Sequence, residues 1–375
     1  MLEQGKISPV QMALLMIPAI IATVLLLVPS ITAKHAHHDL WLSPIWASVT
    51  GFFVVFLSYK LNKLFPKQTI IEYSEHALGK ILGKLVGGIF LFFYFHATGI
   101  MVREYGEFVS GAALFHTPMA VIIGTMVLVC SFAVLGGLEV MGRASEIIVP
   151  VVILLYILLF ILLIKDLEVK NLFPIMEKGF RPSLMGSIVP QSWYSEFILV
   201  SFLLPYVTNQ KKGFKWGLIA VFIVLFLMVL TNIMTLLIFG NLTSSLTYPV
   251  MVAARYISIA DFLEHLESIV MAIWIAGTFI KITVFYYVLA LGTAQWLKLS
   301  DYRPIVLPIG FLILLQGLWA ARDLQELSHF LATSGTIYIL SIQVVIPFIL
   351  LLCASIRKKL GQRKGNKQNE TPVNH

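Results

Sequence analysis

Charge is scarce in this chain, and so is cysteine. Asp, Glu, Lys and Arg make up 12% of the 375 residues, whereas 58% are hydrophobic. Such a composition excludes a soluble globular protein and is typical of an integral membrane protein. The two cysteines, Cys130 and Cys353, both lie in apolar runs. We therefore expect neither a disulfide framework nor a thiolate metal site.

The short motifs that mark catalytic sites are missing as well. The sequence has no nucleophile elbow, phosphate-binding loop, glycine-rich dinucleotide fingerprint or His-Glu-x-x-His zinc motif. His35, His37, His38 and Asp39 form a cluster of possible metal ligands in a predicted hairpin loop. Such a loop does not supply the fixed geometry that a metal needs. We expect no enzymatic activity, no metal site and no cofactor.

Apolar runs of about 20 residues, the length of a membrane-spanning helix, are abundant. Ten of them predict an all-α integral membrane protein in contact with membrane lipid. They cover about residues 8–33, 42–60, 85–114, 118–138, 144–164, 182–205, 216–239, 268–297, 305–321 and 330–356. The expected organisation is one ten-helix transmembrane domain over 1–356 and a basic cytoplasmic tail over 357–375.

The basic residues indicate the orientation in the membrane. The formal net charge of +8 could by itself suggest a nucleic-acid partner. The Lys and Arg residues lie mostly between the apolar runs, however, where they set topology. With both termini in the cytoplasm, the cytoplasmic loops and the tail carry most of these residues. We therefore expect that orientation and no nucleic-acid partner.

Prolines interrupt the first and sixth runs in the same way, at the start, in the middle and at the end. They are Pro9, Pro18 and Pro29 in the first run, and Pro182, Pro190 and Pro205 in the sixth. Paired interrupted helices are typical of transporter binding sites, although prolines are common in membrane helices and the pairing could be chance. Five helices is an odd number, so two sets of five predict an inverted repeat, over about 8–164 and 183–356.

Lys281 and Glu196 lie near the centres of the eighth and sixth runs. Ionisable residues inside a membrane are costly and are usually functional. Pairing the two would offset much of the desolvation that each suffers. Lys281 is interpreted either as a cation that belongs to the site, or as half of a structural ion pair or a lysine that reaches toward the interface.

The third run carries residues at helical spacing that share one face: Phe92, His96, Gly99, Arg103 and Gly106. Arg103 can pair with Glu107 one turn away, and it is interpreted either as a structural pair or as a ligand contact. Interhelical hydrogen bonds are expected from Asn232, Gln316 and Gln343. The connections 70–85 and 248–266 are predicted to be amphipathic interfacial helices or solvated linkers.

Several longer stretches occur in a characteristic order. They are ISPVQ, FPKQTIIEYSEHALGKILGKLVG, GLEVMGRASEIIVP, FPIMEKGF followed by FLLPYV, YPVMVAARYISIADFLEHLE, Phe279-x-Lys281 and Asp301-Tyr302-Arg303. In these stretches the chain resembles the spore germination permeases, the B-type subunits of nutrient germinant receptors in the amino acid–polyamine–organocation superfamily. The resemblance implies a LeuT-like 5+5 inverted repeat with broken helices 1 and 6. It also implies residence in the spore inner membrane, an A-type membrane subunit and a C-type lipoprotein as partners, and a small nutrient, often an amino acid, as ligand.

The same resemblance implies which residues form the site. They are Ala22, Thr23 and Val24 at the first break, Gln191, Ser192, Trp193 and Tyr194 at the second, His96 and Gly99, and Thr278 with Lys281. Glu196 and Arg103 are further charged candidates. The superfamily usually has glycines at the first break, where this chain has none. It also has a sodium position between spans one and eight, which the Lys281 ammonium is expected to occupy.

Three hypotheses of function remain open from the sequence. The first is a receptor in which nutrient binding at the membrane midplane shifts a conformational equilibrium that the A-type partner reads. The second is an orthodox amino-acid transporter, proton-coupled or uncoupled. The third is a scaffold subunit with a degenerate site.

Overall fold

The computed structural model describes residues 2–256 and 267–369. Regular structure in this part of the chain is helical, apart from one isolated parallel β-bridge between Ile7 and Val207. Seven segments are long and apolar enough to cross a membrane, or eight if the bent pair α12 (Arg303–Trp319) and α13 (Leu324–Ala332) is counted as one. The predicted all-α membrane architecture is confirmed.

The other α-helices mostly follow the predicted apolar runs, and α3 and α10 lie in connections between them. In chain order they are α1 (Pro9–Ala36), α2 (Ser43–Leu64), α3 (Ile70–Leu78), α4 (Lys80–Ala112), α5 (Met119–Gly136), α6 (Leu138–Leu163), α7 (Arg181–Ser195), α8 (Val200–Leu203), α9 (Gln210–Phe239), α10 (Pro249–Tyr256), α11 (Glu267–Leu297), α14 (Ser334–Leu340) and α15 (Ile346–Asn369). The start predicted for the tenth run, Phe330, belongs instead to α13, which is bent by 98° from α12. Between α14 and α15 lies the π-helical segment Ser341–Val345.

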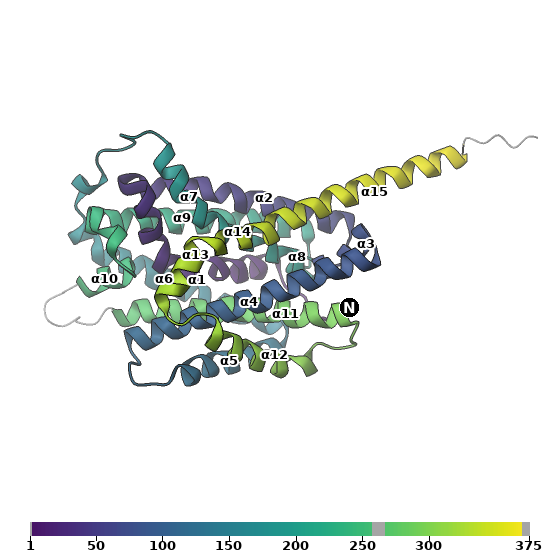
Figure 1. The fold of residues 1–375 in the computed structure, drawn as a ribbon, viewed down its shortest axis with the longest axis horizontal. Coiled ribbons are helices and arrows are strands. Elements are labelled where there is room, and N and C mark those ends of the chain that lie inside the picture. Colours follow the sequence, from purple (N-terminus) through teal and green to yellow (C-terminus); the bar gives the residue numbers. More distant parts are fainter. Residues whose placement is uncertain (1, 257–266, 370–375) are drawn as a thin grey trace, which may run out of the picture.

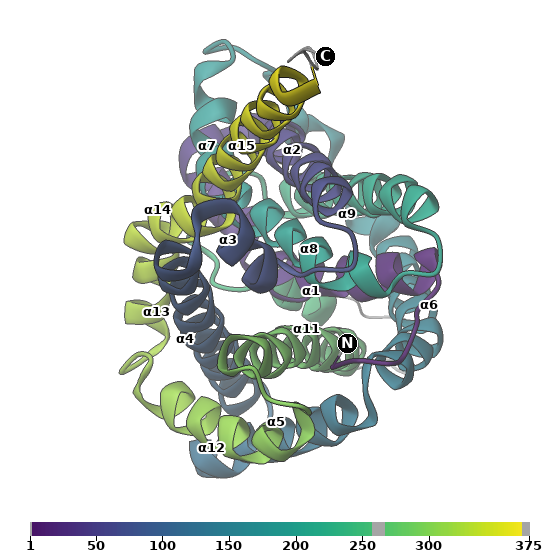
Figure 2. The same ribbon diagram turned by 90° about the vertical axis from the view of Figure 1, so that its right-hand side faces the viewer.

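Helix α1 runs through the middle of the bundle, with α5 and α12 at one edge and α2, α7 and α15 at the opposite one (Figure 2). A helix that is apolar on all sides is expected to be buried, and nearly every residue of α1 from Met12 to Ala33 is. Its first turn is closed by a capping box: Gln11 N donates to Ser8 Oγ at 3.0 Å, and Ser8 N donates to Gln11 Oε1 at 2.8 Å.

The predicted break at Ala22–Val24 is wrong. Helix α1 is continuous from Pro9 to Ala36 and keeps both Pro18 and Pro29 inside it. A proline is tolerated inside a membrane helix when neighbouring helices shield the backbone groups that lose their hydrogen bonds. Without glycine at these positions, an unwound backbone has no advantage over the helix.

The sixth run is interrupted, but later than predicted. Helix α7 continues past Pro190 to Ser195, and the 3-10 segment Glu196–Leu199 follows before the short helix α8. The change in helix type therefore begins at Glu196 and not at Gln191. This places the charged residue of the run at the point where the regular hydrogen-bond pattern ends.

The first residues of the chain tie one end of the bundle together. Beyond the bridge from Ile7 to Val207, Glu3 is 5% exposed and its Oε2 accepts hydrogen bonds from Tyr287 at 3.3 Å and Tyr302 at 3.0 Å. The N-terminus and the last turns of α15 lie at this same end of the molecule (Figure 1). The N-terminal strap, residues 2–8, therefore joins α11 to the turn before α12 and seals this end.

Several predicted polar contacts are present. Asn232 Nδ2 donates to Leu40 O at 2.9 Å, and Gln343 Oε1 accepts from Ser195 Oγ at 2.7 Å. In the cluster at residues 35–39, Asp39 Oδ1 accepts a hydrogen bond from Met176 N at 2.8 Å, so this carboxylate fastens a loop. Connection 70–85 contains helix α3 and the first residues of α4. Connection 248–266 contains α10, and its residues 257–266 lie outside the described part.

Candidate functional site

A buried ion pair lies at the centre of the bundle. Lys281 Nζ is 2.7 Å from Glu196 Oε2 and donates a second hydrogen bond to Thr23 Oγ1 at 3.1 Å. Lys281 is 0% and Glu196 4% exposed. The sequence left open whether these two residues pair; in the structure they do, and the contacts of Lys281 link α1, α11 and the end of α7.

The fold explains why this pair forms here. Lys281 lies in the middle of α11, and Glu196 is the first residue after α7, where the helix changes type. The Lys281 ammonium also lies 5.7 Å from the centroid of the Phe285 ring, within the range of a cation–π interaction. Each charge therefore has partners that offset its removal from water.

A small cavity of about 30 Å³, the polar cavity, adjoins the ion pair. It takes its name from the charged side chains of Lys281, Glu196 and Glu104, because the rest of its wall is mostly apolar. It is lined by Thr23, Phe93, Ala97, Ile100, Met101, Glu104, Trp193, Glu196, Lys281, Phe330, Leu331, Tyr338 and Ile339. A cavity needs roughly 10–15 Å³ to hold one water molecule. The site is therefore closed around a space for about two waters, which is too small for a nutrient. Binding requires this cavity to open.

The cavity-facing side of α4 differs from the predicted one. Phe93, Ala97, Ile100, Met101 and Glu104 line the cavity, whereas the predicted face lies about one position away around the helix. Of that predicted face, Gly99, Arg103 and Gly106 pack toward α12 and α5. A Cβ at Gly99 would lie 2.2 Å from the Gln316 side chain, and one at Gly106 would lie 2.3 Å from Met119 Sδ. The glycines serve close helix packing there.

Glu104 is the functional candidate that the sequence reasoning missed. It is 4% exposed, it lines the cavity, and its Oε1 has no hydrogen-bond partner among the described residues. The available signal was the pairing of Arg103 with Glu107 one turn away, which leaves Glu104 as the charge without a local partner in the third run.

Arg103 lies away from the cavity and braces α4 against α12. Its guanidinium pairs with Glu107 at 2.6 Å and donates to the carbonyl oxygens of Leu318 at 3.3 Å and Arg322 at 2.8 Å. This arrangement matches the structural interpretation of Arg103. His96, which is half-buried, stands edge-on to Phe330 and Tyr338, two residues of the cavity wall.

Of the residues predicted around the second break, only Trp193 lines the cavity. Gln191 bonds to Thr50 and Ser187, and Ser192 Oγ donates to the carbonyl of Val189. Tyr194 is fully buried against α2, where a Cβ at Gly51 would lie 2.9 Å from its ring.

The remaining predicted site residues are buried, and most of them do not line the polar cavity. Val24 and Thr278 are in the core, and the Thr278 hydroxyl has no hydrogen-bond partner among the described residues. Ala22 faces away from the ion pair and lines an apolar pocket next to Gly277. Of the three residues predicted at the first break, Thr23 alone reaches the polar cavity.

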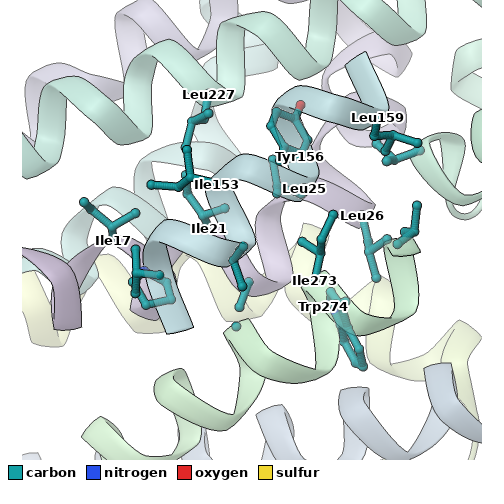
Figure 3. Close-up of a pocket in the computed structure, with 17 residues that line it drawn as sticks. Ile17, Ile21, Leu25, Leu26, Ile153, Tyr156, Leu159, Leu227, Ile273 and Trp274 are labelled. Carbon is teal, nitrogen blue, oxygen red and sulfur yellow. The ribbon is translucent and has the colours of Figure 1, made fainter. Parts of the chain in front are cut away.

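The apolar pocket lies between α1, α6, α9 and α11 (Figure 3). It encloses about 40 Å³, and none of the described residues that line it is charged. Ile21 and Leu25 of α1 line it together with Ile153 of α6, and the Tyr156 hydroxyl is engaged by Thr231 at 2.5 Å. A polar nutrient would lose its hydrogen bonds to water there, so the cavity at the ion pair is the better site.

A larger depression of about 580 Å³, the outer vestibule, opens beside the polar cavity. It is lined by the end of α1, by residues 244–247 and by α13. Leu331 of α13 lines both the outer vestibule and the polar cavity. Leu331 therefore lies between the closed polar cavity and the open outer vestibule.

Solved transporter structures share this architecture. A Na⁺-coupled sialic acid symporter in a substrate-bound outward-open state matches with a TM-score of 0.63 over 92% of this chain and 80% of that chain, at 13% identity. A manganese transporter of Eremococcus coleocola matches with a TM-score of 0.53 over 92% and 74%, at 15% identity. At such identities the likeness concerns the fold alone: the chain has the fold of these LeuT-fold transporters.

The sequence comparisons define the family. A family model described as spore germination protein matches residues 6–325. Spore germination protein KB of Bacillus subtilis (strain 168) is 25% identical over 376 residues, covering 98% of this chain and 99% of the relative. Spore germination protein YndE of the same strain is 25% identical over 360 residues, covering 95% and 98%. The chain belongs to the spore germination protein family, which confirms the resemblance seen in its sequence.

Proposed function

We propose that this chain is the B-type subunit of a spore nutrient germinant receptor and that it binds a small nutrient in the cavity beside Lys281 and Glu196. The observation that carries the proposal is a buried, charged cavity at the centre of a transporter fold, in a chain of the germination family. Nutrient binding opens and recloses this cavity, and the change of conformation is the signal.

The proposal includes ten spans in two inverted halves. The first apolar segment, Pro9–Leu64, contains two helices, α1 and α2, and the interrupted sixth run adds α7 with α8. The two halves, about 8–164 and 183–356, each carry a short amphipathic helix between their second and third spans. These helices, α3 and α10, lie at opposite ends of the molecule (Figure 1), as an inverted repeat requires.

The location and partners follow from the same proposal. The chain resides in the spore inner membrane with both termini and the basic tail in the cytoplasm, and the outer vestibule then faces away from the cytoplasm. An A-type membrane subunit and a C-type lipoprotein complete the receptor. The A-type subunit reads the conformational change, because the fold of this chain has no separate signalling domain among its described residues.

The test is germination against a nutrient panel in spores that lack this chain and all other germinant receptors, compared with spores in which this chain is restored. Restoration of the response to at least one nutrient is the expected result. An identical response in both spore types, for every nutrient, would remove the germination assignment. Uptake of labelled amino acids into proteoliposomes of the purified chain separates the receptor from the transporter, since a receptor gives no sustained accumulation.

A further inference from the structure

Two irregular helical segments meet next to the polar cavity. In the sixth run, the 3-10 segment Glu196–Leu199 follows directly after α7. In the tenth run, the π-helical segment Ser341–Val345 lies between α14 and α15, and Ile346 N donates to Ser341 O, five residues back. The two segments are in contact with each other. One helix is therefore wound more tightly than an α-helix, and its neighbour less tightly, at the same place.

A buried hydrogen bond joins these segments. Ser195 Oγ donates to Gln343 Oε1 at 2.7 Å, and both side chains are 0% exposed. Gln343 belongs to the π-helical segment, and Ser195 is the last residue of α7, directly before Glu196. Turns of π-helix are rare and occur frequently at functional sites. The bond therefore fixes the backbone next to the carboxylate of the central ion pair to such a turn.

The amide of Gln343 is bonded at one end only. Its Nε2 is buried and has no hydrogen-bond partner among the described residues. At the other end, the Ser195 hydroxyl has a single hydrogen, which the Ser192 carbonyl at 2.6 Å shares with Gln343 Oε1. A buried amide nitrogen without a partner is costly, so an arrangement of the helices that satisfies it would gain free energy.

Helices α13 and α14, residues 324–340, lie directly before the π-helical segment and are called the lid below. The lid contributes Phe330, Leu331, Tyr338 and Ile339 to the wall of the polar cavity. Its second helix, α14, also packs against α7. Conversion of the π-helical turn into α-helix would turn α14 by about 100° and shift it by about 1.5 Å relative to α15. The cavity wall would move with it.

We propose that Gln343 is a positioning residue of this site: by holding Ser195 it keeps the π-helical turn in place and the lid closed against the ion pair. Opening of the polar cavity breaks the bond between Ser195 and Gln343 and releases the lid together with the end of α7. The proposal rests on the proposed function in one respect, namely that the polar cavity opens and recloses. It does not depend on which nutrient enters.

The experiment measures how readily the polar cavity opens in the purified full-length chain in lipid nanodiscs, without nutrient. Ala97→Cys, in a background with Cys130→Ala and Cys353→Ser, places a thiol in the cavity wall for a membrane-impermeant thiol reagent. Gln343→Met keeps the size of the side chain and removes its polar ends. We expect it to raise the labelling rate about twofold to tenfold, the effect of losing one hydrogen bond that holds the closed state.

Ser195→Ala removes the other partner of the bond and should raise the labelling rate by a similar factor. Because both substitutions break the same bond, the double variant should label no faster than either single variant. Gln343→Met should keep the melting temperature of the native chain, since the Ser195 hydroxyl retains the Ser192 carbonyl as its acceptor. Gln316→Met is the matched control and should label at the native rate, because Gln316 packs against α4 at Gly99 and does not line the polar cavity.

The role of Gln343 is overturned if Gln343→Met or Ser195→Ala labels at the native rate, or if the two effects multiply in the double variant. It is also overturned if Gln316→Met speeds labelling as much as Gln343→Met does, since the helices would then be loosened in general. None of these measurements involves germination. Spores that germinate identically with and without this chain would remove the proposed function and leave the role of Gln343 standing, so the two failures are distinguishable.

Discussion

At the residue scale, Lys281 is the residue on which the closed site depends most. Its ammonium joins α1 through Thr23 and the end of α7 through Glu196. A compact cation on a flexible stem suits a position between helices that must move relative to one another. The tether holds the closed cavity together, and a ligand that competes for the same ammonium weakens it.

Lys281→Met keeps the volume of the side chain and removes its charge. We expect it to abolish the nutrient response while the protein remains in the membrane, and to lower the free energy of unfolding by about 3–5 kcal/mol because Glu196 is left unpaired. Lys281→Arg should fail as well, since a planar guanidinium does not fit the place of an ammonium. The measurements are germination of variant spores and thermal unfolding of the purified chain.

The double variant Lys281→Met with Glu196→Leu distinguishes a functional from a structural lysine. It removes both charges, so most of the stability should return while the response stays absent. Lys298→Met, at the exposed end of α11, is the matched control and should behave as the native chain. Recovery of the response in the double variant would make the ion pair purely structural.

The sequence indicated that two membrane-buried charges would gain from pairing, without settling whether they do. It did not predict which face of α4 lines the cavity. Adjacent residues of a helix point about 100° apart, and α4 has small or polar residues on several sides. Arg103 drew attention, yet it pairs with Glu107, and Glu104 next to it lines the site. The rotation of the helix follows from close tertiary packing, such as that of α12 against Gly99 and α5 against Gly106.

At the element scale, α4 must cross α3 at very short range. A Cβ at Gly83 would lie 2.3 Å from the Cα of Glu75, a backbone atom that cannot move alone. Gly83→Ala should therefore separate α3 from α4 and lower the melting temperature by several degrees or more. Gly111, also in α4, has no atom within 4 Å of its ideal Cβ, so Gly111→Ala should be neutral or stabilising by up to about 1 kcal/mol. Equal effects of the two substitutions in thermal unfolding would contradict this packing.

Helix α13 is the element that separates the polar cavity from the outer vestibule. Leu331 lines both spaces, so Leu331→Ala should join them. Ala97→Cys, in a background with Cys130→Ala and Cys353→Ser, places a thiol in the cavity wall. We expect a membrane-impermeant thiol reagent added on the vestibule side to label it severalfold faster in the presence of Leu331→Ala.

Leu327→Ala is the matched control for that experiment. Leu327 is a buried leucine of the same helix, 2% exposed, and it lines neither the polar cavity nor the outer vestibule. Labelling rates that rise equally in both variants would show general loosening of α13 rather than a gate at Leu331.

The elements themselves were largely predictable, since apolar runs of the right length form membrane helices in a bundle. Whether the proline-containing runs form broken or continuous helices was not predictable. Pro18 and Pro29 are compatible with an unbroken α1, because helices on all sides shelter its backbone. The bend between α12 and α13 depends on the tertiary contacts of α13. The sequence of α13 is short and partly polar, so by itself it resembles a loop.

At the scale of the whole molecule, the two ends of the bundle are closed differently. At the end that carries the termini, the N-terminal strap inserts Glu3 between Tyr287 and Tyr302. At the other end, one layer of α13 side chains separates the polar cavity from the outer vestibule. We propose that the cavity opens on the vestibule side, from which a nutrient would arrive in the proposed orientation.

The fixed charge of Lys281 predicts that the response does not depend on sodium. We propose that the tethered ammonium, which donates to Thr23 between α1 and α11, takes the place of a dissociable cation. Replacing sodium by choline at constant ionic strength should leave the nutrient concentration for half-maximal germination unchanged. A response that scales with external sodium would contradict this role of Lys281.

Occupancy of the polar cavity is the proposed germination signal, and the substitution Trp193→Ala puts this to the test. Trp193 lines the cavity and is 5% exposed, so loss of its indole should weaken nutrient binding about tenfold or more. Adjacent Tyr194 does not line it, and Tyr194→Ala should reduce stability without changing the affinity of the folded protein. The measurement compares, for each variant, the dissociation constant of the purified chain with the nutrient concentration for half-maximal germination. We expect both concentrations to rise by the same factor in Trp193→Ala. Weakened binding with an unchanged germination threshold would contradict it.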